Sequence, residues 1–209
     1  MVITGIDEKS KNRSALLVDG VIKAWISNDL ILERGLRIGD EISQSELDEL
    51  ISDNNREKTK NRALNILSYR DHSRNELERK LSNKGCAEED TQEVLDRLCE
   101  LGFVNDEAFA HRYYTELTTI RKYSVRRAKA ELVKKGIDRE VIENTVEEVA
   151  VDDVETLLAL FSGKFRNKIN NIEKRNTLAQ SLMRNGFSWS DISSAFLRYD
   201  EEYSDECES

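Results

Sequence analysis

A pattern of about fifty residues occurs three times in this chain and constrains its fold more than any other feature. Each copy ends its central segment on a glycine (Gly85, Gly136 and Gly186), and these glycines stand 51 and 50 residues apart. A leucine stands four residues before each glycine, and small or apolar residues recur eight before, ten after and thirteen after it. A repeat of this length predicts an array of similar modules, each burying a small core of its own.

The segment before each glycine predicts a short helix. In the first copy, Ser73 can cap the helix and Glu76 stands three residues later, which is the spacing of a capping box. Leu77 and Leu81 lie on one face, and Gly85 can end the helix in a left-handed turn. Two leucines alone do not stabilise a helix in water, so we expect it to pack against other helices of its module.

The rest of each copy also carries helical spacing of apolar residues, so we expect three helices in each repeat. The first helix of the second copy, for example, is predicted by a stripe of Phe109, Tyr113, Leu117 and Ile120. The chain has no proline, so no pyrrolidine ring interrupts these helices.

The first 45 residues read differently. Two apolar runs in "ALLVDGVIKAWIS" are joined by Asp19 and Gly20, which is a strong signal for a two-residue β-hairpin. The run "VITGI" before them and "DLILERGLRIGDEIS" after them add short strand-like segments. We therefore expect a small β-rich segment at the N-terminus.

The expected fold is mainly α-helical, with tandem three-helix repeats containing about nine helices and this small β-rich segment. We expect the β-rich segment at 1–45, the repeats at 46–103, 104–151 and 152–200, and an acidic, frayed tail at 201–209.

Composition restricts the location and the partners. No apolar run approaches the roughly 20 residues that span a bilayer, and the N-terminus lacks the hydrophobic core of a signal peptide. We therefore expect a cytoplasmic monomer with no membrane partner. The formal net charge of −9 argues against nonspecific binding to nucleic acid.

The sequence contains no arrangement that predicts catalysis, a cofactor or a metal. We find no GxxxxGK[ST] phosphate loop, no GxGxxG after a strand and no GxSxG nucleophile elbow. The two histidines, His72 and His111, have no cysteine or carboxylate pattern near them that is typical of a metal site. We expect a protein that is not an enzyme.

The charge distribution indicates one candidate surface in the second repeat. Residues 121–135 hold seven basic residues against one acid, Glu131. The seven are the candidate partner-binding residues: Arg121, Lys122, Arg126, Arg127, Lys129, Lys134 and Lys135. Successive helical residues are about 100° apart, which places Arg126, Arg127 and Lys134 opposite the core side. Such a face is either solvated or a surface for phosphates or an acidic protein.

Several stretches resemble the RecX family of regulatory proteins. "RALNILSYRDHSRNELERKLSNKG" resembles its first signature, "LDRLCELGFVNDEAFAHRYY" the segment that follows, and "AKAELVKKGI" its third signature. The N-terminal runs "LLVDG" and "LRIGDEIS" resemble the extension that many members carry. The resemblance covers nearly the whole chain, and it is strongest over residues 62–137.

The resemblance implies an elongated, curved array of three-helix modules. It also implies binding along the groove of the RecA recombinase filament on DNA, and modulation, usually inhibition, of the ATPase and strand-exchange activities of RecA in recombination, DNA repair and the SOS response. The resemblance implies no chemistry on the protein itself. Contact with the DNA backbone, single- or double-stranded, is a weaker expectation here because the chain is acidic overall.

Two other functions fit the residues. The chain could be a helix-turn-helix-like DNA-binding regulator, which would need a basic recognition helix, and the second repeat meets this requirement in part. It could also be a helical-repeat scaffold for another protein. The period of about fifty residues argues against tetratricopeptide repeats, which have a period of about 34.

Overall fold

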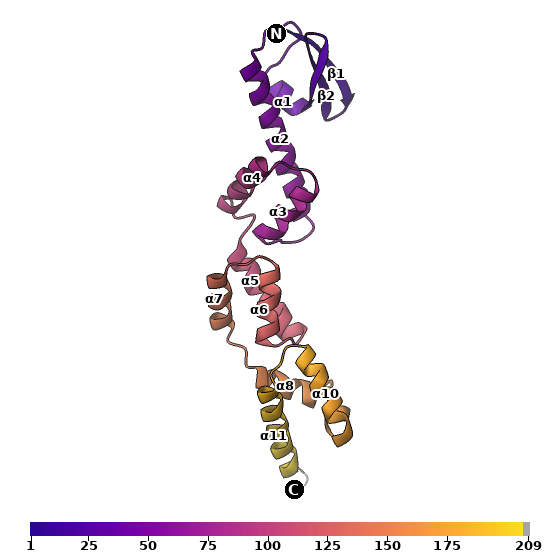
Figure 1. The fold of residues 1–209 in the computed structure, drawn as a ribbon, viewed down its shortest axis with the longest axis vertical. Coiled ribbons are helices and arrows are strands. Elements are labelled where there is room, and N and C mark those ends of the chain that lie inside the picture. The colour runs from indigo at the N-terminus through magenta and orange to yellow at the C-terminus, as the bar shows by residue number, and fades with distance from the viewer. Residues whose placement is uncertain (207–209) are drawn as a thin grey trace. The chain divides into compact units, whose positions relative to one another are not determined.

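The computed structural model describes residues 1–206, and all of their side chains except those of Ile172 and residues 203–206. Contacts divide the chain into two compact units (Figure 1). The first unit comprises residues 1–70 and 77–103, and the second comprises residues 71–76 and the chain from 104 onward. The described residues are mainly helical with one small N-terminal sheet, which confirms the predicted fold class.

The first unit begins with a three-stranded antiparallel sheet in the order β1-β2-β3. The strands are β1 (Ile3–Ser10), β2 (Arg13–Val18) and β3 (Val21–Ser27). The predicted hairpin joins β2 to β3, with Asp19 at φ 48° and Gly20 at φ 78°. Two successive positive φ angles match the right-handed twist of the two strands, which is why Asp-Gly is favoured here.

The segment after the sheet is a helix, and the prediction of further strands there was wrong. Helix α1 (Asn28–Glu33) begins where the Ser27 hydroxyl accepts a hydrogen bond from the Leu30 amide at 3.1 Å. Leu30 and Ile31 are buried against the sheet. The cap decides the outcome because a short apolar run fits a strand and a helix equally well.

Helix α2 (Gln44–Leu67) connects the sheet to the first repeat. It begins in a capping box formed by Ser43 and Glu46. The buried Asn54 side chain accepts from the Ser27 amide at 3.0 Å and donates to the Trp25 carbonyl at 3.1 Å. These bonds satisfy backbone groups of the edge strand β3 and hold α2 along it.

Helices α3 (Arg74–Asn83) and α4 (Glu88–Glu100) follow. Leu77 and Leu81 of α3 are completely buried, as their spacing predicts. The chain leaves α3 through Gly85 at φ 72°. The first turn of α3 is grouped with the second unit, and the rest of the helix is grouped with the first.

The second unit contains two hydrophobic cores. Its helices are α5 (Asp106–Thr115), η1 (Glu116–Ile120), α6 (Val125–Lys134), α7 (Arg139–Val149), α8 (Asp153–Ser162), α9 (Arg166–Ile169), α10 (Ile172–Arg184) and α11 (Trp189–Glu206). Leu132 of α6 and Leu182 of α10 are completely buried in these cores. Gly136 and Gly186 follow the two helices at φ 74° and 97°, so the left-handed turns predicted from the sequence are confirmed.

The apolar stripe predicted for the first helix of the second repeat was wrong at its end. Ile120 is 76% exposed, whereas Tyr114, which the stripe omitted, is completely buried. Ile120 lies at the end of the π-helical segment η1, in which the Arg121 amide donates to the Glu116 carbonyl five residues earlier. Tyr114 lies before this segment, in α5, so η1 accounts for Ile120 alone. A wider turn changes the rotation per residue, so a stripe counted at α-helical spacing loses its phase there.

The C-terminal residues also differ from the prediction of a frayed tail. Helix α11 continues to Glu206, so residues 201–206 are helical. Residues 207–209 of the predicted tail lie outside the described residues.

Candidate partner-binding surface

Helix α6 carries or flanks all seven basic residues that the sequence proposes as a binding surface. The Ser124 hydroxyl caps the helix by accepting from the Arg127 amide at 3.2 Å. Ala128 and Leu132 are completely buried and fix the core side of the helix. The basic residues lie along the remaining sides, but they are not equivalent.

Arg126 and Arg127 contact the turn after α10, so these two side chains are neither purely solvated nor fully available to a partner. Arg126 donates from Nε to the Gly186 carbonyl at 3.1 Å. Arg127 donates from Nη1 to the Asn185 side-chain oxygen at 2.6 Å and to the Arg184 carbonyl at 3.3 Å. Both point away from the core of their own repeat, as helix geometry predicts, but that direction leads to the next repeat. Arg127 thus supplies a donor to the last carbonyl of α10, which has no donor within the helix, and Arg126 supplies one to the turn that follows.

Three further cations are paired with acids at the surface. Arg121 contacts Glu116 at 2.6 Å, Lys129 contacts Glu143 at 2.6 Å and Lys134 contacts Glu131 at 2.8 Å. Acids of the same repeat thus offset much of the positive charge that the sequence concentrates here. Exposed pairs of this kind are weak, so a partner could still separate them at low cost.

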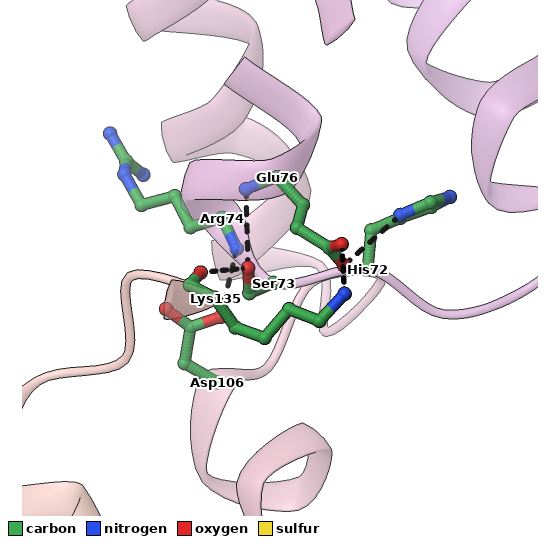
Figure 2. A network of polar contacts seen from close by, with 6 residues as sticks. All are labelled: His72, Ser73, Arg74, Glu76, Asp106 and Lys135. Atoms are coloured by element: carbon green, nitrogen blue, oxygen red, sulfur yellow. Dashed lines mark hydrogen bonds and ion pairs between the residues drawn. The ribbon is translucent and has the colours of Figure 1, made fainter. Parts of the chain in front are cut away.

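Lys135 forms a more protected ion pair with Glu76, shown in Figure 2. The two charged groups are 2.5 Å apart, and their side chains are only 23% and 12% exposed. The other Glu76 oxygen lies 3.4 Å from Nδ1 of the buried His72. Lys135 therefore has a structural role in addition to any role in binding.

Lys122 differs from the other six. It lies in the turn between η1 and α6 at φ 54°, a left-handed conformation that non-glycine residues seldom adopt. It forms no ion pair with any described side chain.

The contacts of Glu76 and Arg127 belong to a junction that the second unit uses twice. In the first copy, Ser73 donates from its hydroxyl to the Lys135 carbonyl at 2.6 Å (Figure 2). In the second copy, the Ser124 amide donates to the Asn185 carbonyl at 3.4 Å. Each serine thus joins the first turn of one repeat's central helix to the last turn of the next repeat's central helix.

An aspartate completes each junction. Asp106, the first residue of α5, accepts from the Arg74 amide at 2.8 Å (Figure 2), and Asp153, the first residue of α8, accepts from the Val125 amide at 2.9 Å. Burial raises the pKa of both carboxyl groups, although the amide bonds act in the opposite direction. Burial and the nearby Asp153 raise the pKa of Tyr114 to about 12. These partly buried carboxylates cap the N-termini of α3 and α6 by accepting hydrogen bonds from their first backbone amides.

Equivalent positions of the repeat carry different side chains at the two junctions. Glu76 and Arg127 each stand nine residues before the glycine of their own repeat, and Lys135 and Asn185 each stand one residue before theirs. The first junction pairs Glu76 with Lys135, and the second pairs Arg127 with Asn185. Both junctions thus have a polar contact at this place, formed by different pairs of side chains.

The neighbouring lysines Lys134 and Lys135 provide a matched test of the junction. Lys135→Met should destabilise the protein by about 1–3 kcal/mol, because it leaves the protected Glu76 carboxylate without its lysine. Lys134→Met should change stability by about 0–1 kcal/mol, because the side chain that it removes is 68% exposed. Chemical denaturation of both variants checks this prediction, and equal losses would contradict a structural role for Lys135.

The remaining candidate sites have no arrangement of groups for chemistry in the described part of the chain. His72 is buried beside Glu76, and His111 lines an open depression with Glu107 and Glu148. Among the described residues, no three His, Cys, Asp or Glu side chains come together as metal ligands would. No described helix is both long enough and apolar enough to span a bilayer.

A second group of cations, which the sequence reasoning missed, lies in the third repeat. Residues 163–175 hold five basic residues against one acid, Glu173. Four of these five residues form no ion pair with any described side chain: Lys164, Arg166, Lys168 and Lys174. We call these four residues the basic loop. The same count of charge that identified residues 121–135 would have found them.

The fold and its junctions define a helical-repeat protein built from three-helix modules. A family model described as "RecX, first three-helix domain" matches residues 60–98, and one described as "RecX, second three-helix domain" matches residues 105–146. The chain is 31% identical to the regulatory protein RecX of Clostridioides difficile over 96% of this chain and 98% of the relative. It is 30% identical to the regulatory protein RecX of Streptococcus gordonii over 97% of this chain and 78% of that protein.

Solved structures agree with this result. A crystal structure of regulatory protein RecX matches with a TM-score of 0.68 at 21% identity, over 96% of this chain and 98% of that chain. The structure of RecX from Lactobacillus salivarius matches with a TM-score of 0.61 at 29% identity, over 70% of this chain and 97% of that chain. The chain belongs to the RecX family of regulatory proteins.

Proposed function

We propose that this chain binds the RecA recombinase filament on DNA and inhibits its ATPase and strand-exchange activities. The observation that carries the proposal is membership of the RecX family over nearly the full chain, at 31% identity and 96% coverage. On this proposal the protein acts in the bacterial cytoplasm as a monomer, by binding alone and without chemistry of its own.

The structure supports a binding mechanism in two ways. Three-helix modules recur along the chain, and a repeated surface suits a repeated partner such as a filament. Contacts to several filament subunits would add avidity through effective concentration, even where each contact is weak.

We further propose that the outer side of α6 contributes to this contact, but with fewer residues than the sequence predicts. Arg126, Arg127 and Lys135 are occupied at the junctions, so changing them would test folding and binding together. Lys122 and Lys134 are the better candidates because the junctions do not use them. Four of the seven cations on or beside α6 are paired with acids, which also disfavours α6 as a base-reading recognition helix.

Co-sedimentation with RecA filaments, assembled on single-stranded DNA with a non-hydrolysable ATP analogue, tests the function. The wild-type protein should sediment with the filaments and lower the DNA-dependent ATPase of RecA. An exposed ion pair contributes up to about 1 kcal/mol, so Lys122→Glu with Lys134→Glu should weaken binding by about tenfold at low salt.

The matched control is Lys11→Glu with Lys23→Glu, two exposed lysines of the N-terminal sheet that change the net charge by the same amount. It should bind as the wild type does. Failure of the wild type to sediment with filaments would overturn the proposed function. Normal binding by the Lys122 and Lys134 variant would overturn only the role of α6.

A further inference from the structure

The N-terminal sheet packs one face against a hydrophobic core and turns the other face outward. Leu16 of β2 is completely buried in that core, and successive side chains of a strand point to opposite faces. In the register of β2 and β3, Leu17 lies opposite Ile22, and Ala15 lies opposite Trp25. We define the outer face by the larger side chains on this side of the sheet: Lys9, Arg13, Leu17, Ile22 and Trp25.

The apolar part of the outer face lies near the hairpin that joins β2 to β3. Ile22 is 52% exposed, and Leu17 opposite it is half-buried. Gly5 of β1 lies opposite Leu17 on its other side and contributes no side chain there. Neighbouring apolar side chains on adjacent strands form a joint surface, so one apolar group of a partner can cover both of them.

The other part of the outer face is positively charged. Nζ of Lys9 and the guanidinium carbon of Arg13 lie 5.8 Å and 5.3 Å from the centroid of the Trp25 ring. Both cations are exposed, and neither forms an ion pair with a described side chain. Cation–π attraction to one ring holds the two charges near each other, although they repel.

A third cation strengthens this positive field from helix α2. Lys58 donates from Nζ to the Trp25 carbonyl at 2.9 Å. Burial lowers the pKa of Lys58, and repulsion from Arg13 and Arg62 lowers it further. Among the strand residues, Asp7 of β1 is the one acid that the register places on the outer face. The surroundings of Trp25 are therefore positive in a chain whose net charge is −9, and they favour an anionic partner.

The combination of cations with apolar side chains favours a protein segment over a strand of nucleic acid. A nucleic-acid strand would stack a base on Trp25, but two cationic side chains already lie over that ring. Phosphates would also leave Leu17 and Ile22 uncovered. Protein interfaces combine an apolar centre with a polar rim, and tryptophan and arginine are frequent anchors in them.

We propose that the outer face of the N-terminal sheet binds an acidic protein segment that carries apolar side chains. Carboxylates of the segment pair with Lys9 and Arg13, and its apolar side chains cover Leu17 and Ile22. This inference goes beyond the proposed function, because it concerns a different part of the chain from α6 and requires neither RecA nor DNA. One face of a three-stranded sheet is a small contact area, so binding should be weak and short-lived.

The test is fluorescence anisotropy of a labelled peptide with the full chain, without RecA or DNA. The probe is a peptide of about twelve residues in which leucine and phenylalanine stand among glutamates, and the wild type should bind it saturably. Lys9→Gln with Arg13→Gln should weaken binding by about tenfold at low salt, because it removes both charge pairs. Ile22→Ser should weaken binding by about fivefold, because it removes apolar surface that the peptide would cover.

The matched control is Lys11→Gln with Lys23→Gln, which removes the same charge outside the outer face. Lys11 lies in the turn between β1 and β2, and the shift in register between β2 and β3 leaves Lys23 unpaired. The control should bind within about twofold of the wild type, and all variants should keep the wild-type melting temperature. Absence of saturable binding by the wild type, or an equal loss in the control, would overturn the proposal. An oligonucleotide that binds through Lys9 and Arg13 while the acidic peptide does not bind would also overturn it.

Discussion

Gly136→Ala and Gly186→Ala should each destabilise the protein by about 2–5 kcal/mol, whereas Gly85→Ala should cost about 1–2 kcal/mol. All three glycines adopt positive φ, at 74°, 97° and 72°, and an L-residue in that region costs about 1–2 kcal/mol. Two of the three have a second cost, because the junctions bring another repeat against them. Overpacking of this kind adds about 1–3 kcal/mol.

The second cost follows from the distances at each junction. A Cβ atom on Gly136 would lie 2.4 Å from Cβ of Asn75, and one on Gly186 would lie 2.4 Å from Oγ of Ser124. A Cβ atom on Gly85 would meet nothing within 4 Å. Gly85→Ala is therefore the matched control, since it has nearly the same φ as Gly136 and lacks the contact.

Chemical denaturation followed by circular dichroism measures the three losses. Adding Asn75→Gly to Gly136→Ala should recover part of the stability, because it removes the atoms that the new methyl group meets; a double-mutant cycle isolates that coupling. Equal losses for Gly85→Ala and Gly136→Ala, with no coupling to Asn75, would show that the junction is not tightly packed.

Leu132→Ala and Leu182→Ala should each destabilise the protein by about 2–5 kcal/mol, because each leaves a cavity in a small core. Both leucines are completely buried, and they occupy the same column of the repeat. Leu132 packs among the aromatic and aliphatic side chains of α5, α6 and α7, and Leu182 among those of α8, α10 and α11. Thermal and chemical denaturation measure the effect.

The next residue along each helix is the control for this prediction. Val133 is 64% exposed and Met183 is 47% exposed. Val133→Ala and Met183→Ala should change stability by about 0.5 kcal/mol or less, as is usual for surface positions. A large effect at either exposed position, or none at the leucines, would contradict the assignment of the buried column.

The contacts that the α6 cations form in the structure show what limits a prediction of binding residues from sequence. Helix geometry correctly places Arg126 and Arg127 away from the core of their own repeat. It cannot show that the turn after α10 lies there, because that contact joins residues about sixty positions apart. Charge counting likewise found seven cations, but it could not show which acids would neutralise them.

The sequence by itself determined the elements whose cause is local. The glycine that ends each central helix, the buried leucine four residues before it and the Asp-Gly hairpin all follow from backbone preferences and helical spacing. The exposure of Ile120 at the end of η1 and the helical state of Asn28–Glu33 could not be predicted in this way. A π-helical turn changes which side of the helix a residue faces, and a serine cap starts a helix, but neither changes the apolar pattern of the sequence.

Only the tertiary structure decided what those glycines and cations do. Gly136 and Gly186 allow one repeat to approach the next, whereas Gly85, in the same column, meets nothing within 4 Å. Lys135 and Arg127 stabilise junctions, and Lys164, Arg166 and Lys168 remain available at the surface. The physical reason is that close backbone approach and charge pairing both depend on distances between segments that are far apart in the chain. No local pattern of residues encodes those distances.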